Sequence, residues 1–427
     1  MGVRIYIYIV FIIPFLLASQ SSLDLILSND KIKNQRIFSN DYHIAFLLPF
    51  CSEKNDILFS GELDSLIANP DFLTEYNLYK KTKISIDFYL GFLLSLKQFS
   101  DEKINISVFD IKEGDTSKNI LKDIVDKKNL NKADLIVGPL YRDNFMFFSN
   151  IFDKKIPIIS PFSKKEYIAN DNENVFQITP INSSQLSFLS KFILNNHIDD
   201  NIILIHRDTI LESSKKLIPE TDQFEIVIDT LIPKDIGYSL IFLNEMDTIL
   251  SNFKQIKVKS NVIDSIHHQL DTLGMKNVII IPSEDNVFVT DLLSKLHACR
   301  DTSMVVYCMN NSSSFDHISI YDLMDMQLTF PLNKLPYDKD VDNFIINYYH
   351  SYNYIPKLKY ASVGYEIGSY FIPLLIRYGD IINNVENYEL QTILGTDYDF
   401  RKTLDGGYVN QAISIFRYHD FGYLKLD

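Results

Sequence analysis

His43-Ile-Ala-Phe-Leu-Leu-Pro-Phe50 is a continuous apolar run of strand length, which is typical of a strand buried on both faces. Segments with apolar residues at helical spacing follow at Ser85–Phe99 and Thr116–Lys128. Strands that alternate with such helices need crossover connections, so this part of the chain predicts a mainly parallel sheet with helices on both faces. The further strands of this first unit are expected at Ile104–Asp110, Asp134–Gly138, Ile156–Pro161 and, in extended form, Phe176–Pro180.

The same alternation of strands and helices is repeated further along the chain. A helix-rich stretch is expected between Leu231 and Leu273, and the Gly406-Gly407 pair marks a turn before a final strand at Val409–Tyr418. No linker rich in Gly or Ser separates the two units. The second unit has expected helices at Ser183–Asn195 and Val287–Cys299 and expected strands at Asn201–His206, Phe224–Leu231, Asn277–Ile281 and Met304–Cys308.

Composition excludes several classes of function. The formal net charge is −14, and a negative surface repels phosphate backbones, so nucleic acid is not expected as a partner. The 427 residues include only 14 Gly, and neither GxGxxG nor GxxxxGK[ST] occurs. There is no GxSxG nucleophile motif, and the SxxK matches at Ser213–Lys216 and Ser251–Lys254 lack the SDN and KTG motifs that accompany them in β-lactamases. The sequence therefore predicts a protein without enzymatic activity.

The N-terminus has the pattern of a secretory signal. Arg4 precedes a 14-residue stretch, Ile5–Ala18, in which the apolar run is broken only by Pro14. This stretch is shorter than the roughly 20 apolar residues of a membrane span, and small residues follow it. We therefore expect a signal peptide at residues 1–19, a leader at 20–41 and an exported, periplasmic protein without a later membrane span. An uncleaved anchor or a buried first strand is the alternative. No Cys stands at the cleavage site, which argues against a lipoprotein.

Cysteines and histidines give no sign of a cofactor. The three cysteines are Cys51, Cys299 and Cys308; Cys299 and Cys308 could form a disulfide, but buried free thiols are the favoured interpretation. The nine His residues show no HExxH spacing, and no CxxC occurs. We expect neither a metal nor another cofactor.

Eight short motifs occur in order along the mature chain. They are Ile44-Ala-Phe-Leu-Leu-Pro-Phe50, Asp87-Phe-Tyr-Leu-Gly91, Ala133-Asp-Leu-Ile-Val-Gly-Pro-Leu140, Ile156-Pro-Ile-Ile-Ser-Pro161, Phe176-Gln-Ile-Thr-Pro180, Asn277-Val-Ile-Ile-Ile-Pro-Ser283, Tyr360-Ala-Ser-Val-Gly-Tyr-Glu366 and Gly406-Gly-Tyr-Val-Asn410. Together they resemble the type I periplasmic-binding fold, also called the leucine-binding-protein-like or receptor-family ligand-binding fold. Within this family the resemblance is to a bacterial envelope branch often fused to LysM modules, although no LysM module is recognisable in this chain.

The resemblance implies an α/β fold of two Rossmann-like lobes with mainly parallel sheets, joined by a multi-crossing hinge. On this basis we expect lobe 1 at residues 42–179, lobe 2 at 180–330 and a C-terminal part at 331–427 that returns to both lobes. In this family the chain crosses between the lobes three times, and ligands bind in the cleft between them. Open parallel sheets bind ligands at the carboxyl ends of their strands, where helix N-termini offer N–H donors.

The resemblance also points to candidate ligand-binding residues. Amino-acid binders of this family place small hydroxyl residues after the two strands that end here at Gly138 and Ser160. In this chain bulky and charged residues replace them, and a Tyr-Gly pair common in the second lobe is absent. A free amino acid is therefore a doubtful ligand. The first loop contains Tyr141, Arg142, Asp143 and Asn144, and the second contains Phe162, Ser163, Lys164 and Lys165. The candidates are Tyr141, Arg142, Asp143, Phe162, Ser163 and Lys164 in these loops, and His206 and Glu366 elsewhere.

Each candidate has an alternative structural role, and two arrangements of the charges remain open. Arg142 and Lys164 could bind an anion, although solvated surface charge is the more common role. Tyr141 and Phe162 could stack on a ligand or pack in the core. Lys164 could neutralise Asp143 and leave no vacancy for a zwitterion. Alternatively, Arg142 could bind a carboxylate and Asp143 an ammonium group.

Two functions are consistent with these features. The first is an exported substrate-binding protein whose lobes close on a small polar ligand, a population shift between open and closed states. The second is an envelope interaction protein. Penicillin-binding-protein activators share the fold and act by contacting a peptidoglycan-synthesis protein, without a small ligand.

Overall fold

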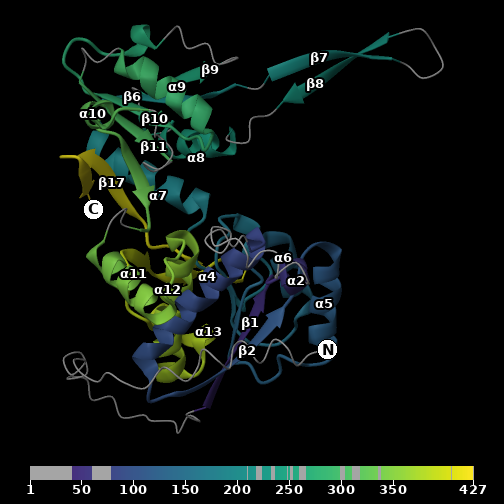
Figure 1. Ribbon diagram of the computed structural model, residues 1–427. Coiled ribbons are helices and arrows are strands. Elements are labelled where there is room, and N and C mark those ends of the chain that lie inside the picture. Colours follow the sequence, from purple (N-terminus) through teal and green to yellow (C-terminus); the bar gives the residue numbers. More distant parts are fainter. Residues whose placement is uncertain are drawn as a thin grey trace, which may run out of the picture. The chain divides into compact units, whose positions relative to one another are not determined.

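The computed structural model describes residues 41–59, 78–208, 210–217, 224–231, 236–247, 249–250, 253–258, 266–298, 303–309, 318–334, 338–404 and 406–426 (Figure 1). The expected signal peptide and leader, residues 60–77, and Cys299 lie outside these residues. Cys51 and Cys308 are buried free thiols. None of the described helices is both long and apolar enough to cross a membrane.

The first sheet has seven strands in the order β15-β16-β5-β4-β3-β1-β2. All neighbouring pairs are parallel except β15 with β16. In chain order its strands are β1 (Asp41–Leu48), β2 (Lys103–Asp110), β3 (Leu135–Val137), β4 (Ile158–Ser160), β5 (Val175–Gln177), β15 (Phe400–Lys402) and β16 (Tyr408–Asn410). The helices that precede or pack on this sheet are α2 (Ser52–Phe59), α4 (Lys80–Ser95), α5 (Gly114–Asp126), α6 (Arg142–Ile151), α11 (Lys339–Tyr352), α12 (Leu358–Tyr378) and α13 (Ile381–Asn384). We call this sheet and its helices the first lobe.

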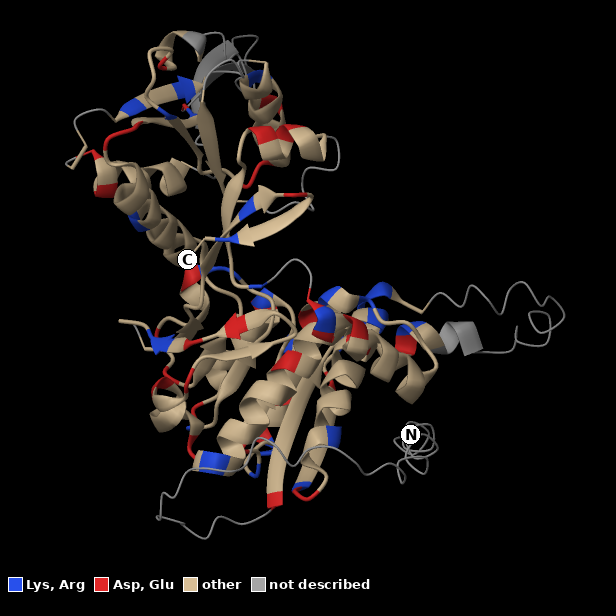
Figure 2. Cartoon of the chain, turned by 90° about the vertical axis from the view of Figure 1, so that its left-hand side faces the viewer, with Lys and Arg blue, Asp and Glu red and all other residues tan. Residues whose placement is uncertain are grey.

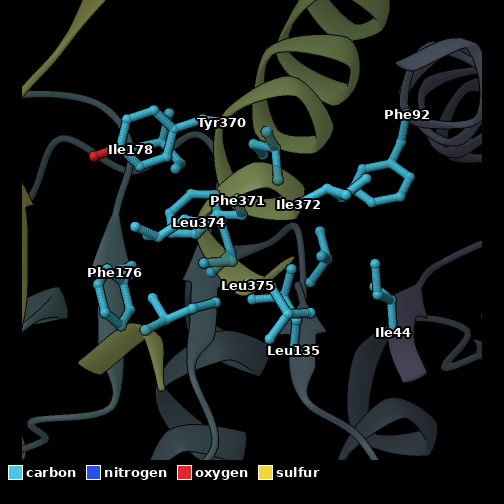
Figure 3. Close-up of a cluster of buried hydrophobic side chains, with 14 of the residues drawn as sticks. Ile44, Phe92, Leu135, Phe176, Ile178, Tyr370, Phe371, Ile372, Leu374 and Leu375 are labelled. Carbon is cyan, nitrogen blue, oxygen red and sulfur yellow. The ribbon is translucent and has the colours of Figure 1, made fainter. Parts of the chain in front are cut away.

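Successive residues of a strand in the first sheet point to opposite faces, and each face has its own hydrophobic core. On one face, Ile44 and Phe46 of β1 share a core with Phe371 and Leu374 of α12 (Figure 3). Helix α4 also contributes to this core. The neighbours of Ile44 and Phe46 in sequence, such as Ala45, face α5 and α6 on the other side. The innermost strands carry almost no charged residues (Figure 2). The sheet is therefore covered by helices on both faces, as the apolar strand runs predict.

The second sheet also has seven strands, in the order β18-β17-β12-β11-β10-β6-β9. Its core strands are parallel, whereas β12 and β17, and β17 and β18, are antiparallel pairs. The strands are β6 (Asn201–Arg207), β9 (Lys254–Val258), β10 (Asn277–Ile281), β11 (Met304–Cys308), β12 (Thr329–Leu332), β17 (Ser414–His419) and β18 (Gly422–Lys425). Helices α7 (Asn182–His197) and α8 (Ile236–Met246) share one core with this sheet, and α9 (Asn286–His297) and α10 (Ile320–Asp325) share the other. We call this unit the second lobe.

The chain passes between the two sheets three times. It leaves β5 of the first sheet for α7, and it leaves β12 of the second sheet for α11, which packs with α4 and α12. It passes a third time between β16 and β17. Two mainly parallel sheets with three connections confirm the predicted fold class.

Three features of the second half differ from the sequence predictions. The single final strand expected at Val409–Tyr418 is wrong: Gln411–Ile413 separates β16 from β17, and the two pair with different sheets. The strand expected at Phe224–Leu231 forms β8, but within the described residues β8 pairs with β7 (Ile210–Leu217) alone, in an antiparallel hairpin outside the main sheet. The expected helix-rich stretch also contains the edge strand β9.

Helices α4 and α12 approach each other so closely that glycine is required at two positions of their contact and favoured at a third. A Cβ atom on Gly364 would lie 1.9 Å from the backbone oxygen of Phe88, and one on Gly91 would lie 2.0 Å from that of Ala361. A Cβ atom on Gly368 would lie 1.9 Å from the Ser95 side chain. This contact attaches the late helix α12 to the first lobe.

We expect Gly364→Ala to destabilise the protein strongly, because the added methyl group meets rigid backbone instead of a movable side chain. Overpacking of this kind costs about 3 kcal/mol at the upper end of its usual range. Gly237→Ala is the matched control, since Gly237 lies in helix α8 with no atom within 4 Å of its would-be Cβ. Thermal unfolding of both variants beside the unmodified protein measures the effect. A Gly364→Ala protein as stable as the Gly237→Ala protein would contradict the observed helix contact.

Candidate functional site

The carboxyl edge of the first sheet brings the N-termini of α5 and α6 to one place. Strand β1 lies between β2 and β3 in the sheet, α5 follows β2, and α6 follows β3. The starts of the two helices therefore emerge on either side of β1, and the helices lie together on one face of the sheet (Figure 1). Their first residues line a hollow of about 460 Å³, which we call the α5–α6 hollow. It is lined by Lys81, Gly114, Asp115, Lys118, Tyr141, Arg142, Asp143 and Asn144.

Gly138 fixes the turn that leads from β3 into α6. Its φ of 93° lies in the left-handed region, and a Cβ there would be 2.6 Å from the carbonyl oxygen of Leu47. Only glycine fits such a position. The Gly138-Pro139 motif seen in the sequence thus places Tyr141, Arg142 and Asp143 at the sheet edge.

Neither helix that opens on the hollow has a side-chain cap at its N-terminus. The N-cap residues are Glu113 for α5 and Tyr141 for α6, and neither side chain accepts a hydrogen bond from the helix backbone. In α9, by contrast, Asp285 accepts hydrogen bonds from the backbone N–H groups of Val287 and Phe288. Uncapped first-turn N–H groups remain available as donors.

Three basic and two acidic side chains line the hollow. Lys81 Nζ lies 2.6 Å from Glu113 Oε2 and 4.7 Å from the centre of the Tyr141 ring. Arg142 Nε lies 3.2 Å from Asp143 Oδ1. Burial raises the pKa of Tyr141 to about 12, so its phenol stays protonated and remains a hydrogen-bond donor at neutral pH. Positive charge exceeds negative charge by one among the lining residues.

The second predicted loop does not contribute to this hollow. The Phe162 ring packs edge-on against Phe88 and Tyr360, with centroids 5.7 and 5.8 Å away. The Ser163 carbonyl accepts a hydrogen bond of 2.9 Å from Gln177 Nε2. Lys164 is exposed and forms no ion pair within the described part of the chain. The suggested neutralisation of Asp143 by Lys164 is absent, because Asp143 pairs with its neighbour Arg142.

His206 and Glu366, the two remaining predicted residues, already have partners within the protein. His206 is buried on β6, with Nδ1 2.8 Å from the Arg207 carbonyl oxygen and Nε2 2.7 Å from Gln255 Nε2. Glu366 is buried on α12, and its carboxylate accepts hydrogen bonds from Lys334 Nζ at 2.7 Å and Tyr398 OH at 2.6 Å. Through its contact with Lys334, Glu366 holds the segment that follows β12 against helix α12.

The second lobe has its own polar cluster at the carboxyl edge of its sheet. Glu284 follows β10, and its carboxylate is oriented by the buried Asn182 amide at 2.9 Å and by the Tyr238 hydroxyl at 3.1 Å. At the end of β6, Arg207 forms an ion pair of 2.8 Å with Asp285. Among these, Glu284 is exposed and can accept further hydrogen bonds.

Sequence reasoning identified Tyr141, Arg142 and Asp143 but missed Lys81 and Lys118 in the hollow. The available signal was the loop after the strand at Ile104–Asp110, because any loop after a parallel strand reaches the same sheet edge. The described residues contain no group of three or more His, Cys, Asp or Glu that could hold a metal ion.

Solved structures that resemble the chain are mostly substrate-binding proteins. A putative branched-chain amino acid ABC transporter protein from Rhodospirillum rubrum aligns with 90% of this chain and 100% of its own, at 11% identity and a TM-score of 0.58. An ABC transporter substrate-binding protein from Desulfitobacterium hafniense, solved in complex with Leu, covers the same shares at 12% identity and a TM-score of 0.50. Full-length LpoA from Haemophilus influenzae aligns with 90% of this chain but 59% of LpoA, at 10% identity and a TM-score of 0.50.

No protein-family model and no curated protein sequence matches the chain. The structural likeness, at such low identity, concerns the fold. The chain has the two-lobed fold of the type I periplasmic binding proteins, as the order of its sequence motifs predicts.

Besides the Tyr141 phenol, the carboxyl group of Asp87 has a raised pKa, and it lies away from the hollow. Asp87 of α4 is fully buried, and neither of its carboxylate oxygens has a hydrogen-bond partner of good geometry. Burial raises the pKa of Asp87 to about 6, although Lys357 and Tyr354 nearby act in the opposite direction. Its place beside the buried Tyr348 marks it as part of the α4–α11 interface.

We expect the free energy of unfolding to fall as pH rises from about 4 to about 6, because folded Asp87 then holds a proton that the unfolded chain has lost. The loss amounts to at most about 3 kcal/mol, since one pKa unit corresponds to about 1.4 kcal/mol. Asp87→Asn should remove this component of the pH dependence. Unfolding in denaturant at pH 4.5 and 7 measures it, with Asp123→Asn on the exposed face of α5 as control. Equal pH dependence in Asp87→Asn and the unmodified protein would contradict this role.

Proposed function

We propose that the chain is an exported binding protein for a small polar ligand, with the α5–α6 hollow as the ligand site of the first lobe. The observation that carries this proposal is the position of the hollow at the carboxyl edge of a parallel sheet, where such sheets bind ligands. Its lining includes Tyr141, Arg142 and Asp143, three of the residues that the sequence predicts.

The composition of the hollow supports a polar ligand and argues against an aliphatic amino acid. Its eight lining residues include no Leu, Ile, Val, Met or Phe, and Tyr141 is the one ring among them. One face of that ring is covered by the Lys81 ammonium group. An aliphatic side chain in this hollow would remove polar groups from water without an apolar contact in return.

The proposed mechanism is closure of the two lobes on the bound ligand. Three separate chain connections join the lobes, and such connections can act as a hinge. The second lobe offers Glu284, already oriented by Asn182 and Tyr238, at the corresponding edge of its own sheet. Binding would then shift the population toward a closed state, without a chemical reaction.

Export to the periplasm is part of this proposal and rests on the apolar stretch Ile5–Ala18. Mass spectrometry of the protein recovered outside the cytoplasm should show a chain that begins near Gln20. A mass that still includes Met1 would contradict cleavage.

An envelope interaction protein is the second candidate, and one surface favours it. The exposed face of α11 carries Ile346 and Tyr349, and Ile355 follows in the next loop, with 52%, 46% and 68% of their surfaces exposed. Ile346→Glu and Tyr349→Glu should abolish cross-linking to a peptidoglycan-synthesis protein if this face is a docking surface. Unchanged cross-linking would remove this candidate.

For the first candidate, we expect thermal-shift screening to separate polar from aliphatic ligands. A ligand that binds only the folded state stabilises it by about 2.7 kcal/mol at 100 times its Kd. Leucine, isoleucine and valine should give no shift, whereas a charged or hydroxylated compound among amino acids, sugars, peptides and muropeptides should. Tyr141→Ala should reduce that shift, and Tyr321→Ala on α10 serves as the control.

Binding of leucine would contradict the expectation of a polar, non-aliphatic ligand. Leucine binding in the micromolar range, about −8 kcal/mol, that is lost in both Arg142→Ala and Asp143→Ala would show that the hollow is an amino-acid site of unusual geometry.

A further inference from the structure

We propose that the α5–α6 hollow binds an oxyanion, the phosphate or carboxylate group of a polar ligand, between the N-termini of α5 and α6. This inference rests on the proposed binding function and names the chemical class of the ligand. It depends on Asn144, on the two helix N-termini and on Lys118.

Asn144 is a largely buried residue whose side-chain amide has no hydrogen-bond partner among the described residues. Only 8% of its surface is exposed, it lines the hollow, and its carboxamide forms no hydrogen bond with the described part of the chain. Every other buried asparagine among the described residues donates at least one hydrogen bond through its side chain: Asn55, Asn174, Asn182, Asn201, Asn277 and Asn410.

The carboxamide atoms of Asn144 are not sealed from solvent, in contrast to the enclosed carboxylate oxygens of Asp87. An amide N–H that has no protein acceptor is free to donate to a ligand. Asn144 lines the hollow of about 460 Å³, which has room for such an acceptor.

The helix N-termini supply the matching polarity. Helices α5 and α6 have 13 and 10 residues, and the first turns of both line the hollow without side-chain caps. At Gly114, the first residue of α5, no atom lies within 4 Å of the would-be Cβ, so a ligand can approach the backbone. Backbone N–H groups and the helix dipole favour an anion at such a position.

The side-chain charges favour the same class of ligand. Lys118 is exposed and has no ion-pair partner among the described residues, whereas Lys81 is held by Glu113 and Arg142 by Asp143. The carboxylates of Asp115 and Asp143 also line the hollow. They oppose a large negative charge, and they can accept hydrogen bonds from hydroxyl or amino groups of the ligand. The lining therefore fits one oxyanion on a polar body.

Titration of the full chain with simple anions tests this assignment. The phosphate arm uses inorganic phosphate and glucose 6-phosphate, the carboxylate arm uses acetate and glucuronate, and sodium chloride at equal ionic strength is the reference. We expect at least one arm to raise the thermal midpoint above the reference, with an effect that weakens as salt is added.

Two substitutions locate the binding. Asn144→Asp keeps the size of the side chain but replaces a donor by an acceptor, and it should abolish the shift. Lys118→Ala should weaken binding roughly tenfold, the effect of losing one hydrogen bond to a charged group. Lys122→Ala, one turn further along the exposed face of α5, is the matched control and should bind like the unmodified protein.

The outcomes separate the two proposals. Equal shifts in the unmodified protein, Asn144→Asp and Lys118→Ala would mean nonspecific screening of surface charge and would overturn the anion site. A neutral ligand that binds through Tyr141 while no anion binds would also overturn the anion site but preserve the binding function. If neither the anions nor the neutral polar compounds bind, both the anion site and the proposed binding function fail.

Discussion

The close approach of α4 and α12 is the contact on which the rest of the architecture depends. Gly91 and Gly364 let the backbone of each helix touch the other, which no residue with a Cβ would permit. Because α12 begins 263 residues after the end of α4 (358 − 95), this contact ties the C-terminal part of the chain to the first lobe. The chain must therefore return from the second lobe after β12, and it must leave the first lobe again to form β17.

The same helix pair connects the core to the chain crossings. Tyr370 and Phe371 of α12 lie in the core of the first lobe (Figure 3). Their rings pack with those of Tyr398 and Phe400. Glu366 on the same helix accepts hydrogen bonds from Lys334 just after β12 and from Tyr398. A buried carboxylate with two donors can fix the path of the chain where it enters the first lobe, since a carboxylate without partners there would be costly.

Sequence patterns predicted the buried parallel strands well, because both faces of such strands are apolar and continuous runs are easy to recognise. They failed where pairing depends on distant segments. Nothing local in Tyr408–His419 shows that β16 pairs with β5 and β17 with β12. The apolar residues of β8 likewise predicted a strand but not its pairing with β7 outside the main sheet.

In the candidate site, too, residues placed by local sequence could be predicted, whereas residues placed by distant pairing could not. Tyr141, Arg142 and Asp143 could be predicted because they follow a recognisable strand and the Gly138-Pro139 turn. Lys118 also follows a recognisable strand, but its place beside Arg142 depends on the strand order β3-β1-β2, which brings α5 beside α6 and which no local pattern shows. Glu366 is also polar in the sequence, but burial against Lys334 and Tyr398 gives it a structural role that no local pattern reveals.

Hydrogen–deuterium exchange of the full chain, with and without a saturating anion, tests the central claim most directly. If the anion lies between the two helix N-termini, amides at residues 114–118 and 142–146 should be protected together, because both first turns donate to the same group. Protection of one segment alone, or protection confined to the second-lobe edge near residues 283–290, would contradict a site shared by α5 and α6.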